Sequence, residues 1–394
     1  MLDILFFIVI GVLLGIVVGF VPGFSSNNLS MLVITYGLIS SDYHLAVTAV
    51  AIEISSSFFE FLSPMIFGIG NDATALAADV AYSGITEESF RRGVSIVISG
   101  GLIGILVAMP LIFFAEKIYP TVYSSLKPLV TWILLFLCVY MAWIERTWKK
   151  KFFAATVFIL SGMMGLLIKN SGLISSDYLL LPVFIGLYGF SSILSKRHGK
   201  EELIQDITFV EKVRSAAIAF IASMFASLIP GMKRGQASAV ALQIGGVMKR
   251  EEVLFILPLV SLAFATLSIF ILGSTGRVRS SLTYDIQEVV GNPYFSQTAL
   301  FAGSVAITAC ISSVILIFVA KPIGKLLSKI NERYLKIFGF VIAAALVINF
   351  TGFYGILIAF TATCIGLLSS KFGTRSVHLM GVLLLPSIIS SVVL

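Results

Sequence analysis

Long apolar segments follow one another along this chain, with only short polar stretches between them. A segment needs about 20 residues to cross a hydrocarbon core of about 30 Å. Only 12% of the 394 residues are charged, against roughly 25% in soluble proteins. With no room left for a soluble domain, the sequence predicts an all-α, polytopic membrane protein. The candidate segments are 4–21, 24–40, 44–63, 92–115, 128–145, 152–169, 179–195, 213–229, 235–248, 252–273, 296–319, 335–349, 352–369 and 376–394.

The charged residues indicate membrane orientation and give no sign of a nucleic-acid surface. The net charge of +7 is carried in short loops, where Lys and Arg mark the cytoplasmic side. The first 90 residues contain no Lys or Arg, so we expect the N-terminus and the loop at 40–43 to lie outside the cytoplasmic membrane. The basic loops at 145–151 and 195–200 are expected inside.

Motifs of enzymes and metal sites are absent from the sequence. There is no G-x-x-x-x-G-K-[ST] phosphate loop, no H-E-x-x-H zinc motif and no G-x-S-x-G nucleophile motif. The three cysteines lie within apolar segments and imply no disulfide framework. The histidines, among them His378, lie at the ends of segments or in the linker, where we expect them to be solvated. We therefore expect no catalytic residues, no bound metal and no cofactor other than a coupling ion.

The two halves of the chain begin in the same way. GVLLGIVVGFVPGFSSNN (11–28) and AFIASMFASLIPGMKRGQ (219–236) align at a constant offset of 208 residues, which pairs the two Pro-Gly dipeptides. Each copy carries a small residue at every fourth position before the proline, which permits close helix contact. The alignment predicts a duplication, with a first membrane repeat at 1–195, a charged cytoplasmic linker at 196–212 and a second repeat at 213–394.

The loop charges further predict that the two repeats are inverted. The first repeat has no basic residue before Arg91, whereas Lys212 and Lys249 flank the start of the second, so the two Pro-Gly segments are expected to enter from opposite sides. Each repeat then has a re-entrant helical hairpin broken at Pro-Gly, about five transmembrane helices and a second polar loop. If the arms of the hairpins are full spans instead, the sides of the loops are unchanged. Inverted repeats with broken helices are typical of secondary transporters.

The Pro-Gly breaks are the first candidate binding site. Proline removes a backbone donor, and a helix that restarts after the break presents free N–H groups and the positive end of its dipole, which favours an anion. The alternative is a plain kink with a packed polar cap. The residues expected to contact an anion are Pro22, Gly23, Ser25, Ser26, Asn27 and Asn28 in the first copy, and Pro230, Gly231, Lys233, Arg234 and Gln236 in the second.

A second pair of polar loops follows one span later in each half. These loops are GIGNDATA (68–75) and GSTGRVRS (273–280). The paired N–H donors of a guanidinium match two oxygens of a carboxylate or phosphate at once, so the arginines are candidates for substrate contact. Alternatively, they face bulk water in an external loop. The candidate residues are Gly68, Asn71, Arg277, Arg279 and Ser280.

Acidic residues at membrane depth are candidates for ion coupling. Glu53 and Glu60 are seven residues apart, so they share one helical face two turns apart, and Asp72 follows in the loop. Such residues are costly within a membrane and mark ion pathways. We expect them to bind H⁺ or Na⁺. A buried pairing with the arginines named above is the alternative.

Several of these motifs are shared with a known family. The segments are GIVVGFVPGFSS, SPMIFGIGNDATALAADVAYSG and LIPGMKRGQASAVAL. In addition, the loop GSTGRVRSSLTYDI resembles the basic glycine-serine loop found in archaeal-type members of that family. Over nearly its whole length the chain resembles the TctA family, the large membrane subunit of tripartite tricarboxylate transporters. The resemblance implies a permease for an organic anion. It also makes a small membrane subunit and a solute-binding protein candidate partners.

A second transporter function stays open at this point. PGFSSNN also resembles the DUF368 family, which is proposed to move polyprenyl phosphate, and a lipid phosphate would use the same helix ends and the same basic residues. A channel is the less favoured alternative, because paired breaks fit an occluded site better than a continuous pore. We expect a secondary transporter of the cytoplasmic membrane that moves an organic anion at a midplane site between two broken hairpins, coupled to H⁺ or Na⁺.

Overall fold

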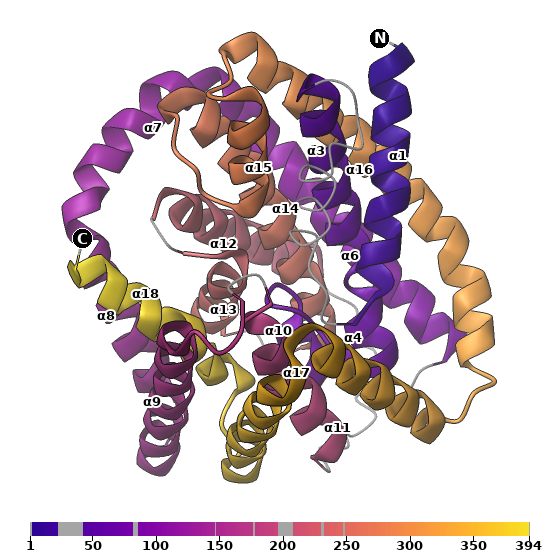
Figure 1. Ribbon diagram of the computed structural model, residues 1–394, viewed down its shortest axis with the longest axis vertical. Helices are drawn as coiled ribbons and strands as arrows, with labels where there is room; N and C mark the ends of the chain where they lie inside the picture. The colour runs from indigo at the N-terminus through magenta and orange to yellow at the C-terminus, as the bar shows by residue number, and fades with distance from the viewer. Residues whose placement is uncertain are drawn as a thin grey trace.

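The computed structural model describes residues 2–22, 42–81, 86–145, 147–175, 178–195, 208–229, 232–246 and 249–393, and every regular element in these ranges is helical (Figure 1). The helices are α1 (Leu2–Phe20), α3 (Asp42–Phe59), α4 (Leu62–Phe67), α5 (Ala75–Ala81), α6 (Glu87–Ala108), α7 (Ile112–Leu126), α8 (Val130–Trp143), α9 (Trp148–Ser171), α10 (Leu180–Phe184), α11 (Ser191–Leu194), α12 (Phe209–Leu228), α13 (Arg234–Gly245), α14 (Arg250–Thr275), α15 (Ser281–Val290), α16 (Phe295–Leu327), α17 (Glu332–Phe372) and α18 (Gly381–Val393).

Seven helices in the described residues are long and apolar enough to cross a membrane. An eighth span is formed if the segments Tyr119–Leu126 and Val130–Met141, which meet at 71°, count as one. The predicted segments 335–349 and 352–369 are two helical stretches of α17 that meet at a kink at Gly352, where the backbone is not helical, with φ 60° and ψ −153°. The prediction of an all-α, polytopic membrane protein is confirmed.

Helices α1 and α3 pack in parallel through backbone contacts. A Cβ atom at Gly11 would lie 2.7 Å from the carbonyl oxygen of Thr48, and one at Gly15 would lie 2.7 Å from that of Ile52. The glycines predicted to permit close helix contact therefore do so, as small residues do between membrane helices. Because the numbers of the contacting residues rise together, both helices begin at the same end of the molecule (Figure 1).

The second half repeats this contact between α12 and α14. The Ser223 hydroxyl donates to the carbonyl oxygen of Val260 at 3.4 Å. Ser223 follows Gly15 by 208 residues, and Val260 follows Ile52 by the same number. The offset of 208 residues found in the sequence thus also relates the contact between Gly15 and Ile52 to the contact between Ser223 and Val260.

Helices of the two halves pack against one another in two related pairs. At the start of α6 and α14, Nη1 of Arg250 donates to the Ser89 hydroxyl at 3.3 Å. At the start of α3 and α16, Nε2 of Gln297 donates to the Tyr43 hydroxyl at 2.6 Å. The end of α14 lies beside the start of α16, because Gly273 of α14 packs on Thr298, the residue that follows Gln297 in α16. Since α14 ends where α3 and α16 begin, α3 and α14 run in opposite directions.

Helices α9, α11, α17 and α18 form a second group, in the lower part of Figure 1. Here α9 packs on α18, with Gly165 against the backbone of Val382, and α17 packs on the π-helical segment Ile185–Phe190. Most of the predicted linker lies outside the described residues. Helix α12 begins near the C-terminal end of the linker, where the Thr208 side chain caps the first turn and Glu211 completes a capping box.

Candidate functional site

The first turn of α13 meets the loop between α4 and α5. A Cβ atom at Gly235 would lie 2.1 Å from the carbonyl oxygen of Asp72, so only glycine permits this approach. Gly68 ends α4 with φ 69°, in the left-handed region. The structure therefore brings together the polar loop of the first half and the helix that follows the Pro-Gly dipeptide of the second half.

Asn71 shapes this loop and ties it to α3. Its side-chain oxygen accepts hydrogen bonds from the backbone N–H groups of Ala73 and Thr74 at 3.0 and 3.1 Å, an Asx turn. Its Nδ2 atom donates to Oε2 of Glu60 at 2.6 Å. Asn71, predicted to contact substrate, thus fixes the loop and holds one of the predicted coupling residues.

Arg234, the first residue of α13, is buried against α3. Its Nη1 atom donates to Oε1 of Glu53 at 2.7 Å and to the Ser57 hydroxyl at 3.2 Å, and lies 3.9 Å from Oε1 of Glu60. Only 6% of the residue is exposed. The alternative considered for the acidic residues, a buried pairing with arginine, is what the structure shows for Glu53.

The cluster has more negative than positive groups. Glu53 and Glu60 are both buried, and Arg234 is the one basic residue that the structure shows paired with them among the described residues. Oε1 of Glu60 makes no hydrogen bond within those residues. Two buried carboxylates therefore share one guanidinium within the described residues, and a buried carboxylate is costly unless it is paired or protonated.

The start of α13 is held by polar contacts on both sides. The backbone N–H of Lys233 donates to Oε1 of Gln236 at 2.7 Å, and Nε2 of Gln236 donates to the Ser387 hydroxyl of α18 at 3.1 Å. The Lys233 side chain is exposed, and Pro22 is buried at the end of α1. The remaining predicted residues at the breaks lie outside the described residues: Gly23, Ser25, Ser26, Asn27, Asn28, Pro230 and Gly231.

The basic loop between α14 and α15 lies in different surroundings. The guanidinium carbons of Arg277 and Arg279 lie 4.1 and 4.8 Å from the ring centre of Tyr123 on α7. Nε and Nη2 of Arg279 are buried and make no hydrogen bond within the described residues. Ser280 caps α15, because its hydroxyl accepts from the backbone N–H of Thr283. These arginines and Arg234 therefore contact different helices.

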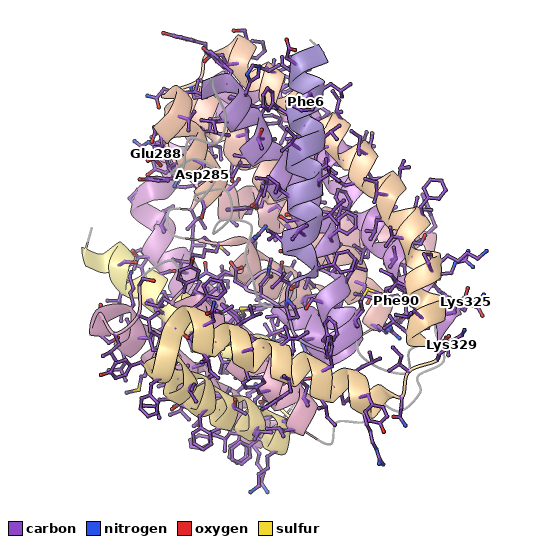
Figure 2. All side chains as sticks on the ribbon, turned by 45° about the vertical axis from the view of Figure 1, so that its right-hand side comes forward. Phe6, Phe90, Asp285, Glu288, Lys325 and Lys329 are labelled. Carbon is purple, nitrogen blue, oxygen red and sulfur yellow. The ribbon has the colours of Figure 1, made fainter. Side chains whose placement is uncertain are left out.

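Sequence reasoning missed Asp285, which lies on α15 (Figure 2). The residue is 4% exposed, and its Oδ2 atom has no hydrogen-bond partner in the described part of the chain. Burial, together with the nearby carboxylates of Glu53 and Glu288, raises the pKa of Asp285 to about 8. The signal in the sequence was an acidic residue on the apolar face of a short helix.

A second buried polar cluster was also missed. His378 is fully buried, so the expectation of a solvated histidine is wrong. Its Nε2 atom lies 3.0 Å from Oε1 of Glu145, and Nε of Arg375 lies 3.7 Å from the same oxygen. Arg375 also donates to Gln243 of α13 at 3.4 Å. This Glu145 cluster ties the far end of α13 to the segment after α17, a contact between residues too far apart in the chain for spacing to indicate.

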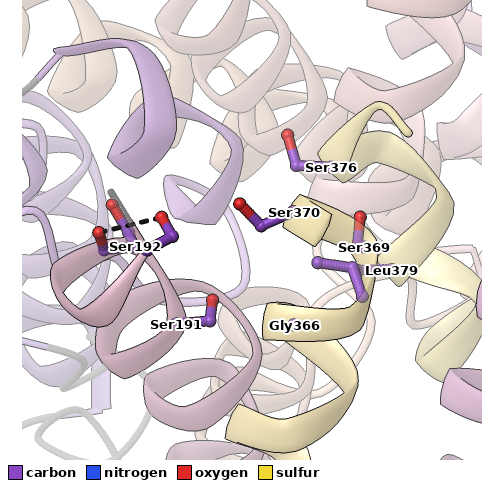
Figure 3. A pocket seen from close by; sticks show the side chains of 8 residues that line it. Ser191, Ser192, Gly366, Ser369, Ser370, Ser376 and Leu379 are labelled. Carbon is purple, nitrogen blue, oxygen red and sulfur yellow. Dashed lines mark hydrogen bonds between the residues drawn. The ribbon is translucent and has the colours of Figure 1, made fainter. Parts of the chain in front are cut away.

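A small pocket opens beside that segment, between α11 and the end of α17 (Figure 3). Its lining carries hydroxyl groups and no ionisable side chain, so it offers no charge to an anion. The lining residues are Ser191, Ser192, Ser195, Gly366, Ser369, Ser370, Ser376 and Leu379.

Comparison with known proteins assigns a family to nearly the whole chain. Residues 5–381 match the sequence profile described as the Tripartite tricarboxylate transporter TctA family. An uncharacterized protein of Methanocaldococcus jannaschii is 24% identical over 412 aligned positions, which cover 99% of each chain. No solved structure matches the chain.

Proposed function

We propose that this chain, which belongs to the tripartite tricarboxylate transporter TctA family, moves a carboxylate-bearing organic anion at a site formed where α13 begins. The family makes the chain a membrane subunit of a transporter. The observation that carries the proposal is the junction of Gly235 with the backbone of Asp72, because it joins the start of a broken helix in one half to the polar loop of the other.

The start of α13 has the chemistry that an anion requires. The first turn of a helix carries N–H groups without intrahelical partners and the positive end of the dipole. The exposed Lys233 side chain adds a positive charge at the same place, and the buried guanidinium of Arg234 adds another beneath it. A carboxylate at this position would lie close to two cations and to backbone donors.

Arg234 would also couple the anion to a cation. In the structure its Nη1 atom forms an ion pair with Glu53 and lies near Glu60. When a proton or Na⁺ neutralises either glutamate, the guanidinium loses an ionic partner and becomes available to the substrate carboxylate. When no cation is bound, the glutamates compete with the substrate for Arg234. Anion and cation would therefore bind together, which is the requirement of symport.

The arrangement of helices supports alternating access. The helices α3 and α14, which the offset of 208 residues pairs, run in opposite directions, as two inverted repeats require. The predicted site lies between elements of both halves. A rocking motion of one half against the other would expose this site to each side in turn.

Two further parts of the proposal follow from the family. The word tripartite implies two partners, and we propose a small membrane subunit and a solute-binding protein that delivers the anion. We place the protein in the cytoplasmic membrane with its N-terminus outside, because basic residues are absent before Arg91.

The test is uptake of labelled citrate into liposomes that contain the purified protein, under an imposed H⁺ or Na⁺ gradient. We expect saturable uptake that depends on one of the two gradients, and loss of uptake in Arg234→Gln. Lys325→Gln on the exposed surface of α16 is the matched control and should transport normally. Uptake that ignores both gradients would contradict coupling, and flux that never saturates would favour a channel.

Thermal unfolding of the same protein tests the substrate class. A ligand that binds only the folded state raises the unfolding temperature. We expect stabilisation by di- or tricarboxylates. If polyprenyl phosphate stabilises the protein and every carboxylate fails, the carboxylate proposal is wrong and the lipid-phosphate alternative takes its place.

A further inference from the structure

Helix α15 lies along the first part of α3 and faces it with an apolar side. Val289 packs against Leu45 and Ile52 of α3. Asp285 precedes Val289 by four residues, so it lies on the same face one turn earlier. Glu53, the next residue after Ile52, acts electrostatically on Asp285. Asp285 thus faces the helix that carries the coupling glutamates, while Glu288 is exposed (Figure 2).

The surroundings of Asp285 disfavour its ionised form. The residue is 4% exposed, and its Oδ2 atom makes no hydrogen bond within the described residues. Among the described residues, α15 packs mainly against α3 and α14. The ionisable residues of α3 are Asp42, Tyr43, His44 and Glu53, and α14 has none from Val253 to Thr275. Glu53 and Glu288 are the charged groups that act on Asp285, and both are acidic.

The geometry favours a proton over a metal ion at this position. Within the described residues, no three His, Cys, Asp or Glu side chains are arranged to hold a metal. A bound Na⁺ or Ca²⁺ would need several oxygen ligands, whereas Oδ2 of Asp285 has no polar neighbour within hydrogen-bonding distance in the described part of the chain. A proton satisfies a single carboxylate oxygen and removes the cost of burying its charge.

We propose that Asp285 carries a second proton in the transport cycle, at a site distinct from the glutamate cluster around Arg234. This rests on the proposed function, because it assigns one of the coupled ions. Glu60 is the residue after the end of α3 and follows Glu53 by seven residues, about 10 Å at 1.5 Å per residue. Glu53, and not Glu60, is among the charges that act on Asp285, so the Asp285 carboxyl lies nearer Glu53 than Glu60.

The first experiment needs no substrate. Infrared difference spectra of the purified protein between about pH 6 and pH 10, a range that brackets the raised pKa, report the C=O band of protonated carboxyl groups. We expect the wild type to lose such a band with a midpoint near pH 8. Asp285→Asn should lack this component, and the exposed control Glu288→Gln should retain it. An unchanged band in Asp285→Asn would show that Asp285 is ionised and would overturn the proposal.

Asp285→Glu is the control that separates loss of the carboxyl group from misfolding of Asp285→Asn. It keeps the carboxyl and should shift the band and its midpoint without abolishing them. A spectrum identical to that of wild type would also contradict the assignment. The infrared result stands whether or not citrate is transported, so failure of the proposed function is distinguishable from failure of this site.

The second experiment measures protons moved per anion from the reversal potential of citrate transport in liposomes. Asp285→Asn should move one proton fewer per citrate than wild type, while Glu288→Gln should match wild type. The same stoichiometry in all three proteins would show that the proton on Asp285 takes no part in transport, and would overturn the proposal.

Discussion

Arg234 and Glu53 join the two halves of the chain in one buried ion pair, with 2.7 Å between Nη1 and Oε1. The pair places the first residue of α13 on the middle of α3. Any movement of α13 relative to α3 must break or rearrange this contact, so the strength of the pair and the mobility of the predicted site are linked.

Removal of Arg234 alone is expected to destabilise the protein more than removal of the whole pair. Arg234→Gln leaves Glu53 buried without its guanidinium, which costs about 3–5 kcal/mol when one partner of a buried pair is lost. The double variant Arg234→Gln, Glu53→Gln removes both charges and should recover most of this loss. Denaturant unfolding in detergent measures both. Equal stability of the single and double variants would show that the pair carries no such coupling.

Arg279 is expected to contribute to anion binding if the second polar loop contacts substrate. Its buried Nε and Nη2 atoms make no hydrogen bond within the described residues, and a hydrogen bond to a charged group contributes about 1.5–3 kcal/mol. Arg279→Gln should therefore weaken binding roughly 10- to 150-fold. Calorimetric titration of citrate measures this, with Lys329→Gln, an exposed residue just after α16, as control. Wild-type affinity in Arg279→Gln would exclude the loop from the site.

The Glu145 cluster should make stability depend on pH in the acid range. The hydrogen bond from His378 lowers the pKa of Glu145, and the charge of Arg375 lowers it further against the effect of burial. A carboxyl with a lowered folded-state pKa stabilises the fold above its unfolded pKa of about 4.3 and loses this effect as the pH falls through the folded value.

We therefore expect Glu145→Gln to be less stable than wild type at neutral pH and the difference to shrink in acid. Thermal unfolding across this range measures it, with the exposed Glu288→Gln as control. A stability difference that grows toward acid pH would contradict a lowered pKa for Glu145 in the folded protein.

Gly15 and Gly303 form a matched test of close packing between helices. A Cβ at Gly15 would lie 2.7 Å from the carbonyl oxygen of Ile52, whereas one at Gly303 would have no neighbour within 4 Å. Gly15→Ala should lower the free energy of unfolding by about 1–3 kcal/mol, as overpacking does. Gly303→Ala should raise it by about 0.4–1 kcal/mol, because the unfolded chain becomes less flexible. Equal stability of the two variants would show that α1 and α3 separate easily.

The predicted topology is testable by cysteine labelling in a background that lacks the three native cysteines. Cysteines that replace Asp3 and Asp42 should react with an impermeant reagent from outside, and those that replace Lys249 and Lys371 only from inside. The opposite directions of α3 and α14 require Asp42 and Lys249 to differ. Labelling of both from one side would contradict the inverted arrangement.

Periodicity and composition predicted the helical membrane fold because they follow directly from the solvent in which the chain must fold. The small residues before Pro22 also predicted a close helix contact, and the structure confirms it between Gly15 and Ile52. Glu53 was singled out by its cost in a membrane, and the structure places it in a buried ion pair. Its partner could not be chosen, because 181 positions separate it from Arg234 and several basic residues were available.

Asp285 and His378 were missed because their burial could not be predicted from the sequence. Each lies in a stretch polar enough to be taken for a loop or a segment end, and only the packing of α15 and of the segment after α17 buries them. Burial of a polar side chain in such a stretch depends on contacts between distant helices, and neither hydrophobic period nor local spacing reports those contacts.

The ion pair between Glu53 and Arg234 has a consequence for how the protein is made. The ribosome delivers Glu53 to the membrane 181 positions before Arg234. During that interval the first half must hold this acid protonated or keep it at the insertion machinery, because Arg234 is not yet available to neutralise it. Synthesis of the first half alone should therefore give an unstable product, and co-expression with the second half should rescue it.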